Sequence, residues 1–143
     1  MKILFLCVAN SARSQLAEGL AKFLLNEKTQ IQSAGSMPSG SVHPWAIQSL
    51  MEIGIDIQQN SSKSFHQIPQ DFLSDLDFVI TLCAEEICPV MITKAKRLHW
   101  PIQDPANASK DQMPEAFRSA RDEIRKKLLA FGKEHDLLKT DSL

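Results

Sequence analysis

The stretch that decides the fold is residues 2–26, which read KILFLCVANSARSQLAEGLAKFLLN. Its apolar start, residues 2–6, predicts a buried strand, and residues 13–26 repeat apolar side chains at helical spacing. Small and polar residues at 8–12 join the two segments. A buried strand, a tight loop and an amphipathic helix in this order are typical of the first unit of a parallel α/β sheet.

The rest of the chain alternates in the same way. Further strands are predicted at 30–35, 77–83 and 95–101, and helices at 43–54 and 113–135, with a short helix or turn at 68–77. A further helix is expected between the third and fourth strands. This order predicts an α/β fold in a single domain over residues 1–143, with a four-stranded parallel sheet flanked by helices on both faces. The last residues, 135–143, are expected to fray.

The composition excludes several classes of function. The net charge is −1, and the chain has neither a basic stripe nor a pI above about 9, which argues against a nucleic-acid partner. No apolar run approaches the ~18 residues of a membrane span, and the run at the start of the chain is shorter than the core of a signal peptide. We therefore expect a cytoplasmic, monomeric protein that binds neither nucleic acid nor membrane.

Cys7 and Arg13 flank a loop at the carboxyl end of the first predicted strand, the edge where parallel sheets bind ligands. The loop residues between them are Val8, Ala9, Asn10, Ser11 and Ala12. A tight curl of such residues directs successive backbone N–H groups at an anion, and the following helix adds its N-terminal partial charge. The guanidinium of Arg13 suits a tetrahedral oxyanion. Because the same surroundings stabilise a thiolate, the sequence predicts an oxyanion site with Cys7 as its nucleophile.

A buried, inert Cys7 is the alternative, because free cysteine often packs in protein cores. The arginine six positions later and the polar Asn10, Ser11 and Ser14 favour the reactive site over this alternative. The nucleotide-binding pattern GxxxxGK[ST] is absent, which argues against a kinase or a GTPase.

Two motifs resemble a known family. The segment CVANSARSQ, residues 7–15, resembles the active-site loop of low-molecular-weight protein tyrosine phosphatases and of the arsenate reductases that share their fold. Ala9 stands where the phosphatases usually have glycine. The segment WPIQDPA, residues 100–106, resembles their Asp-Pro motif, which implies that Asp104 is the general acid. An oxygen leaving phosphorus or arsenic departs more readily when it is protonated, although an aspartate before proline is also typical of turns.

The other two cysteines favour a reductase over a phosphatase. Cys83 ends the third predicted strand, and Cys88 follows five positions later. A phosphatase needs one cysteine, whereas reduction of arsenate takes two electrons, which a dithiol supplies. The pattern TLC…CP followed by HWPxxDPA resembles thioredoxin-coupled arsenate reductases, and the resemblance runs from residue 2 to residue 131. The chain has no tyrosine, and Ala106 leaves little surface for an aryl ester to stack on.

The resemblance implies a relay of three thiols. The Cys7 thiolate attacks arsenic while Asp104 protonates the departing oxygen, Cys83 then attacks Cys7 and releases arsenite, and Cys88 finally attacks Cys83. An external thiol reductant, thioredoxin or glutathione with glutaredoxin, reduces the last disulfide, and no bound cofactor is expected. Five residues of continuous helix rise about 7.5 Å, beyond the ~4.4–6.8 Å Cα separation of a disulfide. The segment is therefore expected to unwind on oxidation and to expose Cys88 in part.

Four residues are expected to support the site. Asn10 has a short amide that can hold the loop by bonding its backbone, and Ser14 can either donate to the Cys7 sulfur or cap the helix. In some of these reductases the positions matching Glu18 and Ser33 help to bind potassium near the loop. Lys63 stands here where those relatives have an acid, so the resemblance implies that its ammonium replaces the cation, pairs with Glu18 and removes any dependence on potassium. A Lys63 side chain that is simply solvated at the surface fits the sequence equally well.

Other functions stay open on the sequence alone. A low-molecular-weight phosphatase would hydrolyse phosphotyrosine or small phosphoesters through a Cys7 phosphoenzyme. A non-catalytic oxyanion-binding or partner-binding module is disfavoured by the intact set of Cys7, Arg13 and Asp104. No metal is expected, because the histidines lack the paired spacing of a zinc site. They are His43, His66, His99 and His135, and the two tryptophans, Trp45 and Trp100, are expected to pack in the core or at its rim.

Overall fold

Four parallel strands form the sheet, in the spatial order β2–β1–β3–β4. The computed structural model describes residues 1–84 and 93–139, and it confirms the predicted α/β fold. The strands are β1 (Lys2–Cys7), β2 (Gln30–Gly35), β3 (Phe78–Thr81) and β4 (Lys96–His99). β1 lies between β2 and β3, so the loop that leaves its carboxyl end at Cys7 lies in the middle of the ligand-binding edge.

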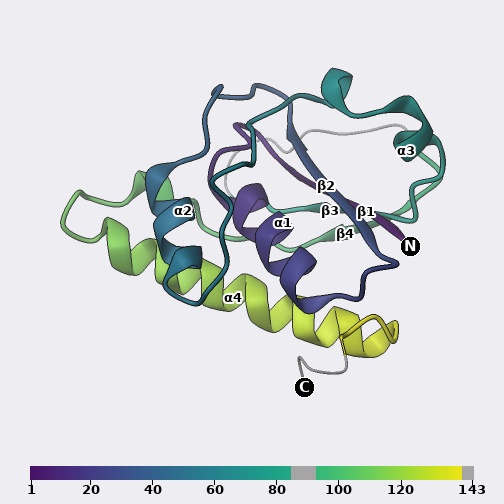
Figure 1. Ribbon diagram of the computed structural model, residues 1–143. Helices are drawn as coiled ribbons and strands as arrows, with labels where there is room; N and C mark the ends of the chain where they lie inside the picture. Colours follow the sequence, from purple (N-terminus) through teal and green to yellow (C-terminus); the bar gives the residue numbers. More distant parts are fainter. Residues whose placement is uncertain (85–92, 140–143) are drawn as a thin grey trace.

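The helices cover both faces of the sheet unequally. They are α1 (Arg13–Leu24), α2 (Pro44–Met51), α3 (Gln70–Ser74) and α4 (Met113–Glu134), with short 3₁₀ turns η1 (Phe65–Gln67) and η2 (Pro105–Asn107). Helices α1, α2 and α4 pack together on one face, and Figure 1 shows α4 running beneath the other two, with α3 at the opposite side of the molecule. The helix expected between the third and fourth strands lies outside the described residues.

Alternate residues of β1 supply the two cores. Ile3 and Phe5 are fully buried against the face that carries α1 and α4, and Leu4 and Leu6 are buried against the face that carries Phe72 of α3. A strand that is apolar on both sides is typical of a central parallel strand, because helices cover both of its faces. The continuous apolar run that predicted β1 is therefore explained by its central place.

Several predicted boundaries are off by one to three residues, and the predicted fraying of the tail is wrong for residues 137–139. β3 ends at Thr81 rather than at residue 83, because the carbonyl of Leu82 instead accepts hydrogen bonds from the loop after β4 and from Arg13. Helix α2 ends at Met51, and a turn carries the chain to residue 54. The tail does not fray at 137–139.

Residues 137–139 are held in place because α4 leaves room for them. Leu137 is buried, Leu138 forms an antiparallel bridge with Leu25, and Lys139 N–H donates to the Leu24 carbonyl at 3.0 Å. A side chain at Gly132 would lie 2.9 Å from Leu25, so the glycine makes space for these leucines.

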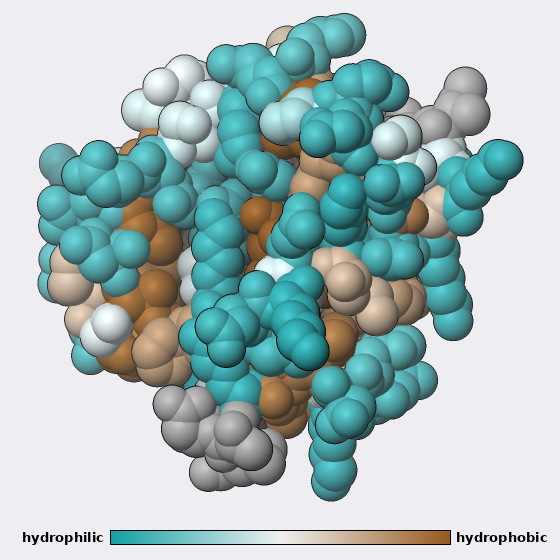
Figure 2. All heavy atoms as spheres, turned by 45° about the vertical axis from the view of Figure 1, so that its right-hand side comes forward, coloured by the Kyte–Doolittle hydropathy of each residue, from teal (hydrophilic) through white to brown (hydrophobic). Residues whose placement is uncertain are grey.

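The face of the molecule seen in Figure 2 is mostly hydrophilic, with apolar side chains in separate patches. Among the described residues, the exposed large apolar side chains are those of Met1, Phe23, Met37, Met51 and Ile53. Within the described ranges, no helix has both the length and the apolar character that a membrane span requires.

Gly35 provides the first testable consequence of the fold. It lies opposite Cys7 in the sheet, and a Cβ there would overlap the carbonyl oxygen of Val8 and lie 3.0 Å from the backbone nitrogen of Asn10. Because both neighbours are backbone, we predict that Gly35→Ala lowers the free energy of unfolding by about 1–3 kcal/mol and weakens phosphate binding. Denaturant unfolding and phosphate titration measure the two effects. The exposed neighbour Ser36→Ala is the control, and a Gly35→Ala protein with wild-type stability and binding would contradict the prediction.

Candidate functional site

The loop from Val8 to Ala12 joins the end of β1 to the start of α1. Cys7, the last residue of β1, is 2 % exposed, and Asn10 in the middle of the loop has a left-handed backbone with φ of 49°. Asparagine tolerates this conformation better than most residues with a side chain. The reversal at Asn10 curls the chain tightly enough for α1 to begin at Arg13.

Every backbone carbonyl of this loop accepts a hydrogen bond from outside the curl. Val8 and Ala9 accept from the N–H groups of Met37 and Ser39 at 2.9 and 3.0 Å. Ser11 accepts from the His43 N–H at 2.9 Å, and Ala12 from the Leu16 N–H at 2.9 Å. The remaining acceptor, the carbonyl of Asn10, is bonded by the side chain of Gln15 at 3.2 Å.

This pattern fixes where the N–H groups point. In a trans peptide the N–H lies opposite the preceding carbonyl, so carbonyls held on the outside turn the following N–H groups inward. The N–H groups of residues 9–12 donate to no group in the described part of the chain. They form, with the N-terminus of α1, a set of donors that can bind an oxyanion beside Cys7.

Asn10 holds the loop through its amide, but the backbone it bonds belongs to another segment. Its Oδ1 accepts from the Lys63 N–H at 2.8 Å, and its Nδ2 donates to Ser14 Oγ at 2.7 Å and to Ser33 Oγ at 3.0 Å. The predicted bond to the loop's own backbone is therefore replaced by bonds to α1, to β2 and to the segment before η1. The amide is buried, so these bonds compete little with water.

Ser14 faces the nucleophile rather than the end of the helix. Its Oγ lies 2.8 Å from Cys7 Sγ, and the N-cap residue of α1, Ala12, has no side-chain cap. Because Ser14 Oγ already accepts from Asn10, its own hydrogen is free to donate to the sulfur. Of the two predicted roles of Ser14, the structure therefore shows the contact with the sulfur and not the capping of the helix.

Arg13 and Asp104 meet at the same edge. Arg13 is 4 % exposed, and its NH1 donates to the carbonyls of Leu82 at 3.4 Å and Ile102 at 2.9 Å. Its NH2 lies 3.7 Å from Asp104 Oδ2, while Asp104 Oδ1 accepts from the Ala106 N–H at 3.0 Å. One carboxylate oxygen thus orients Asp104, and the other faces the guanidinium of Arg13.

Cys83 lies close to this group along the chain. It is 1 % exposed and directly follows Leu82, whose carbonyl Arg13 holds. Cys83 is disulfide-bonded, whereas Cys7 is a free thiol. Cys88 lies outside the described residues, and so do the predicted unwinding and exposure of its segment.

A buried ion pair lies one turn further along α1. Glu18 is 3 % exposed, and its Oε1 accepts from Ser33 Oγ at 2.5 Å and lies 3.3 Å from Lys63 Nζ. Burial by itself raises the pKa of Glu18, but Lys63, Ser33 and Lys22 outweigh it and hold the pKa below its ordinary value. The side chain of Lys63 is 13 % exposed, so the alternative of a solvated lysine is wrong. Its role as a substitute cation stays a prediction.

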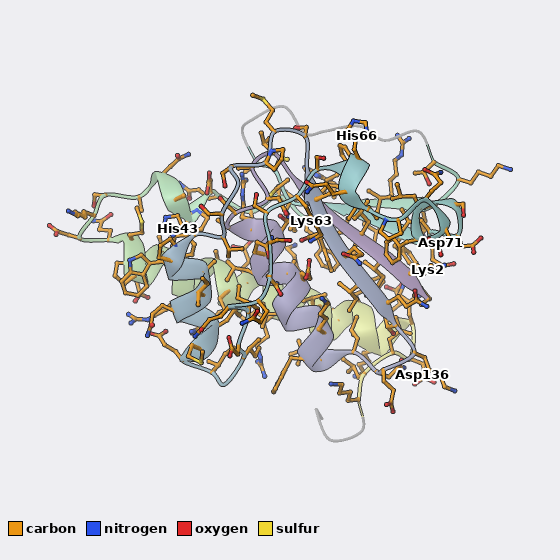
Figure 3. All side chains as sticks on the ribbon, turned by 45° about the horizontal axis from the view of Figure 1, so that its top comes forward. Lys2, His43, Lys63, His66, Asp71 and Asp136 are labelled. Atoms are coloured by element: carbon orange, nitrogen blue, oxygen red, sulfur yellow. The ribbon has the colours of Figure 1, made fainter. Side chains whose placement is uncertain are left out.

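The sequence reasoning missed the part that His43 plays in the site. His43, the N-cap of α2, donates its backbone N–H to the loop, and its ring packs on Phe117 at 4.7 Å. Burial lowers the pKa of His43, and the charge of Asp104 opposes this shift. Figure 3 shows His43 and Lys63 on either side of the start of α1. Only Lys63 could be picked from the sequence, because backbone donors leave no pattern of residue types.

The remaining predictions concern metal and packing. No three side chains of His, Cys, Asp or Glu gather within residues 1–84 and 93–139. Trp100 packs against Phe5 and Phe131, with ring centroids 6.3 and 5.9 Å apart, and Trp45 packs against the same core, as expected for residues at its rim.

Comparison with known proteins identifies relatives over nearly the whole chain. The family described as low molecular weight phosphotyrosine protein phosphatase matches residues 2–141. An arsenate reductase of Halalkalibacterium halodurans is 40 % identical over 134 residues, covering 91 % of this chain and 94 % of the relative. An arsenate reductase solved in the phosphate-binding state shares 32 % identity with a TM-score of 0.75, over 93 % of this chain and 97 % of the other. A thioredoxin-dependent arsenate reductase of Corynebacterium glutamicum shares 27 % identity with a TM-score of 0.67, over 93 % of this chain and 62 % of that one.

The ion pair of Glu18 and Lys63 gives a prediction on stability. Lys63→Met leaves a buried carboxylate with Lys22 alone, so we expect a loss on the order of 2 kcal/mol at pH 7, below the ~3–5 kcal/mol of a buried pair broken in full. Because the pKa of Glu18 is lowered in the fold, its stabilising effect is present above its ordinary value of 4.5 and is lost as the pH falls through the lower folded value. Denaturant unfolding of wild type and variant at pH 7 and pH 4 should show the difference shrinking at pH 4. The exposed Lys28→Met is the control, and a difference independent of pH would contradict the role of Glu18.

Proposed function

Since the chain belongs to the low molecular weight phosphotyrosine protein phosphatase family, we propose that it is an arsenate reductase that carries two electrons to arsenate through Cys7, Cys83 and Cys88. The observation that carries the proposal is the place of the second cysteine. Cys83 is buried and adjoins Leu82, whose carbonyl bonds the same Arg13 that lies 3.7 Å from Asp104. Hydrolysis of a phosphoester has no use for a second thiol at this point.

The first step uses the loop as an oxyanion site. Arsenate accepts hydrogen bonds from the N–H groups of residues 9–12 and from Arg13, which places arsenic in front of Cys7 Sγ. The thiolate, supported by Ser14, attacks arsenic and forms a sulfur–arsenic bond. Asp104 gives its proton to the departing oxygen, which leaves as water or hydroxide.

The next steps move two electrons and restore Cys7. The Cys83 thiolate attacks Cys7 Sγ, and the electron pair of the sulfur–arsenic bond goes to arsenic, which leaves as arsenite. Cys88 then attacks Cys83 in the Cys7–Cys83 disulfide, so that Cys7 is released as a thiolate and the disulfide moves to Cys83 and Cys88. Cys7 is a free thiol and Cys83 is disulfide-bonded, which supports a relay that ends with its disulfide away from Cys7.

An external dithiol completes the cycle. It supplies the two electrons that reduce the last disulfide, and no bound cofactor takes part. The thioredoxin-dependent reductase of Corynebacterium glutamicum supports thioredoxin as the partner over glutathione and glutaredoxin. Arsenate and phosphate are both tetrahedral oxyanions, and the relative solved in its phosphate-binding state supports a site of this shape.

Phosphoester hydrolysis is the second candidate, and one observation favours it. Cys7, Arg13 and Asp104, which suffice for a phosphatase, are already gathered at the sheet edge. The first half-reaction is common to both chemistries, so slow hydrolysis of an activated phosphoester is expected beside reduction.

A coupled assay separates the two candidates. We predict arsenate-dependent NADPH consumption with thioredoxin and thioredoxin reductase for the wild type, and at most one turnover for Cys83→Ser and Cys88→Ser. Hydrolysis of p-nitrophenyl phosphate should persist in both variants and be lost in Cys7→Ser, which controls for chemistry elsewhere. If all but Cys7→Ser hydrolyse the phosphoester and none consumes NADPH with arsenate, the protein is a phosphatase and the relay is wrong.

Asp104 gives a prediction that tests its role as acid. Asp104→Asn cannot donate a proton, so arsenite formation in a single turnover should slow by about 10²-fold or more, because hydroxide is a poor leaving group. Hydrolysis of p-nitrophenyl phosphate should slow less, since its phenolate leaves without much protonation. The exposed Asp111→Asn is the matched control. Equal losses with both substrates would mean that Asp104 only positions Arg13.

A further inference from the structure

One peptide group of the oxyanion loop is held in a different way from the others. The carbonyls of Val8, Ala9, Ser11 and Ala12 accept from backbone N–H groups of neighbouring segments or of α1. Among the described residues, the carbonyl of Asn10 accepts a hydrogen bond from Gln15 Nε2 and from no other donor. The orientation of the peptide between Asn10 and Ser11 therefore depends on a single side chain.

Gln15 is built into the structure as a fully satisfied buried amide. It is 0 % exposed, and Nε2 donates to Asn10 O at 3.2 Å, Asn10 Oδ1 at 3.1 Å and Ser61 O at 3.0 Å. Its Oε1 accepts from Asn60 Nδ2 at 3.1 Å. With two hydrogens for three acceptors, one hydrogen is shared between the two oxygens of Asn10. The segment of residues 60–61 thus fixes which way the amide of Gln15 points.

We propose that Gln15 is a positioning residue for the oxyanion site: by holding the Asn10 carbonyl outward it keeps the Ser11 N–H directed at the bound oxyanion. The peptide is planar, so this N–H points opposite the carbonyl that Gln15 holds. The inference deepens the proposed function but requires only that the loop binds a tetrahedral oxyanion.

Without the hydrogen bond from Gln15, the peptide between Asn10 and Ser11 can turn over. Asn10 has a positive φ of 49°, which leaves rotation about its ψ and the φ of Ser11 as the motion that turns the peptide over. A turned peptide withdraws one N–H donor from the anion and brings a carbonyl oxygen toward it. Each hydrogen bond to a charged group is worth about ten- to hundredfold in affinity, so even partial turning weakens the site.

The experiment measures oxyanion binding directly, with inorganic phosphate as the probe. Calorimetric titration of reduced protein compares wild type, Gln15→Met, Gln15→Glu and Gln48→Met. Methionine keeps the volume but has no donor, so phosphate should bind about tenfold more weakly. Glutamate also lacks the donor and sets a carboxylate oxygen against the Asn10 carbonyl, so it should bind at least as weakly. Gln48 lies exposed on α2, and its replacement should change nothing.

A second measurement follows single amides, and its first part needs the wild type only. In ¹H–¹⁵N NMR spectra the Ser11 amide proton should move downfield on addition of phosphate, and in Gln15→Met this shift should shrink while that of Ala12 persists. A merely structural role would lower thermal stability without changing either readout. Phosphate affinity within twofold of wild type in Gln15→Met, or a Ser11 amide that does not respond in the wild type, would overturn the proposal.

The failure of this proposal and of the proposed function can be told apart. Wild-type protein that binds phosphate but does not reduce arsenate leaves the role of Gln15 intact while the reductase assignment fails. If the wild type reduces arsenate and Gln15→Met leaves phosphate binding unchanged, the reductase assignment stands and the proposed role of Gln15 fails. Under the proposal, Gln15→Met raises the KM for arsenate and leaves kcat at saturating arsenate close to wild type.

Discussion

The structure depends on the common direction of the peptide groups in one short loop. The carbonyls of residues 8–12 are all held outside the curl, which leaves the N–H groups of the following residues for an anion. No single element achieves this. The donors come from the segment after β2, from the start of α2 and from within α1, so the fold has to bring all three to the end of β1. A parallel sheet with β1 in the middle is a geometry that does so, because neighbouring strands and their loops reach the same edge.

Buried hydrogen bonds also fix the polar side chains that pack against the loop of residues 8–12. Glu18, Ser33, Asn10 and Ser14 form a buried chain of hydrogen bonds that ends at the sulfur of Cys7. A buried carboxylate is costly without cations, and Lys63 and Lys22 meet that cost. Because each member is satisfied by the next, the chain fixes the orientation of Asn10 and Ser14 and so the surroundings of the nucleophile.

The sequence predicted the fold class, the parallel sheet, and the carboxyl edge of the sheet at which Arg13 and Asp104 lie 3.7 Å apart. These succeeded because strand and helix periodicity, and the rule that loops at carboxyl ends share one edge, depend only on local pattern. Prediction from the sequence failed where a contact is made by a backbone group or by a residue that lies far away along the chain. His43 bonds Ser11 through its main chain, and residues 137–139 pack because Gly132 makes room for them. Strand β3 stops early because the Leu82 carbonyl accepts from the Ile102 N–H and from Arg13. None of these contacts produces a motif or a periodic pattern in the sequence.

The same arginine links oxyanion binding to the second thiol. Arg13 cannot turn freely toward an anion, since NH1 is held by the carbonyls of Leu82 and Ile102. Those two bonds fix the end of β3 and the loop that carries Asp104 relative to the loop that carries Cys7. Cys83 follows Leu82 directly, so its backbone is placed by the same arginine that we propose to bind the oxyanion. A phosphatase requires only the link to Asp104, whereas a thiol relay also requires the link to Leu82, because Cys83 has to reach the sulfur of Cys7 while the arsenic is still bound there.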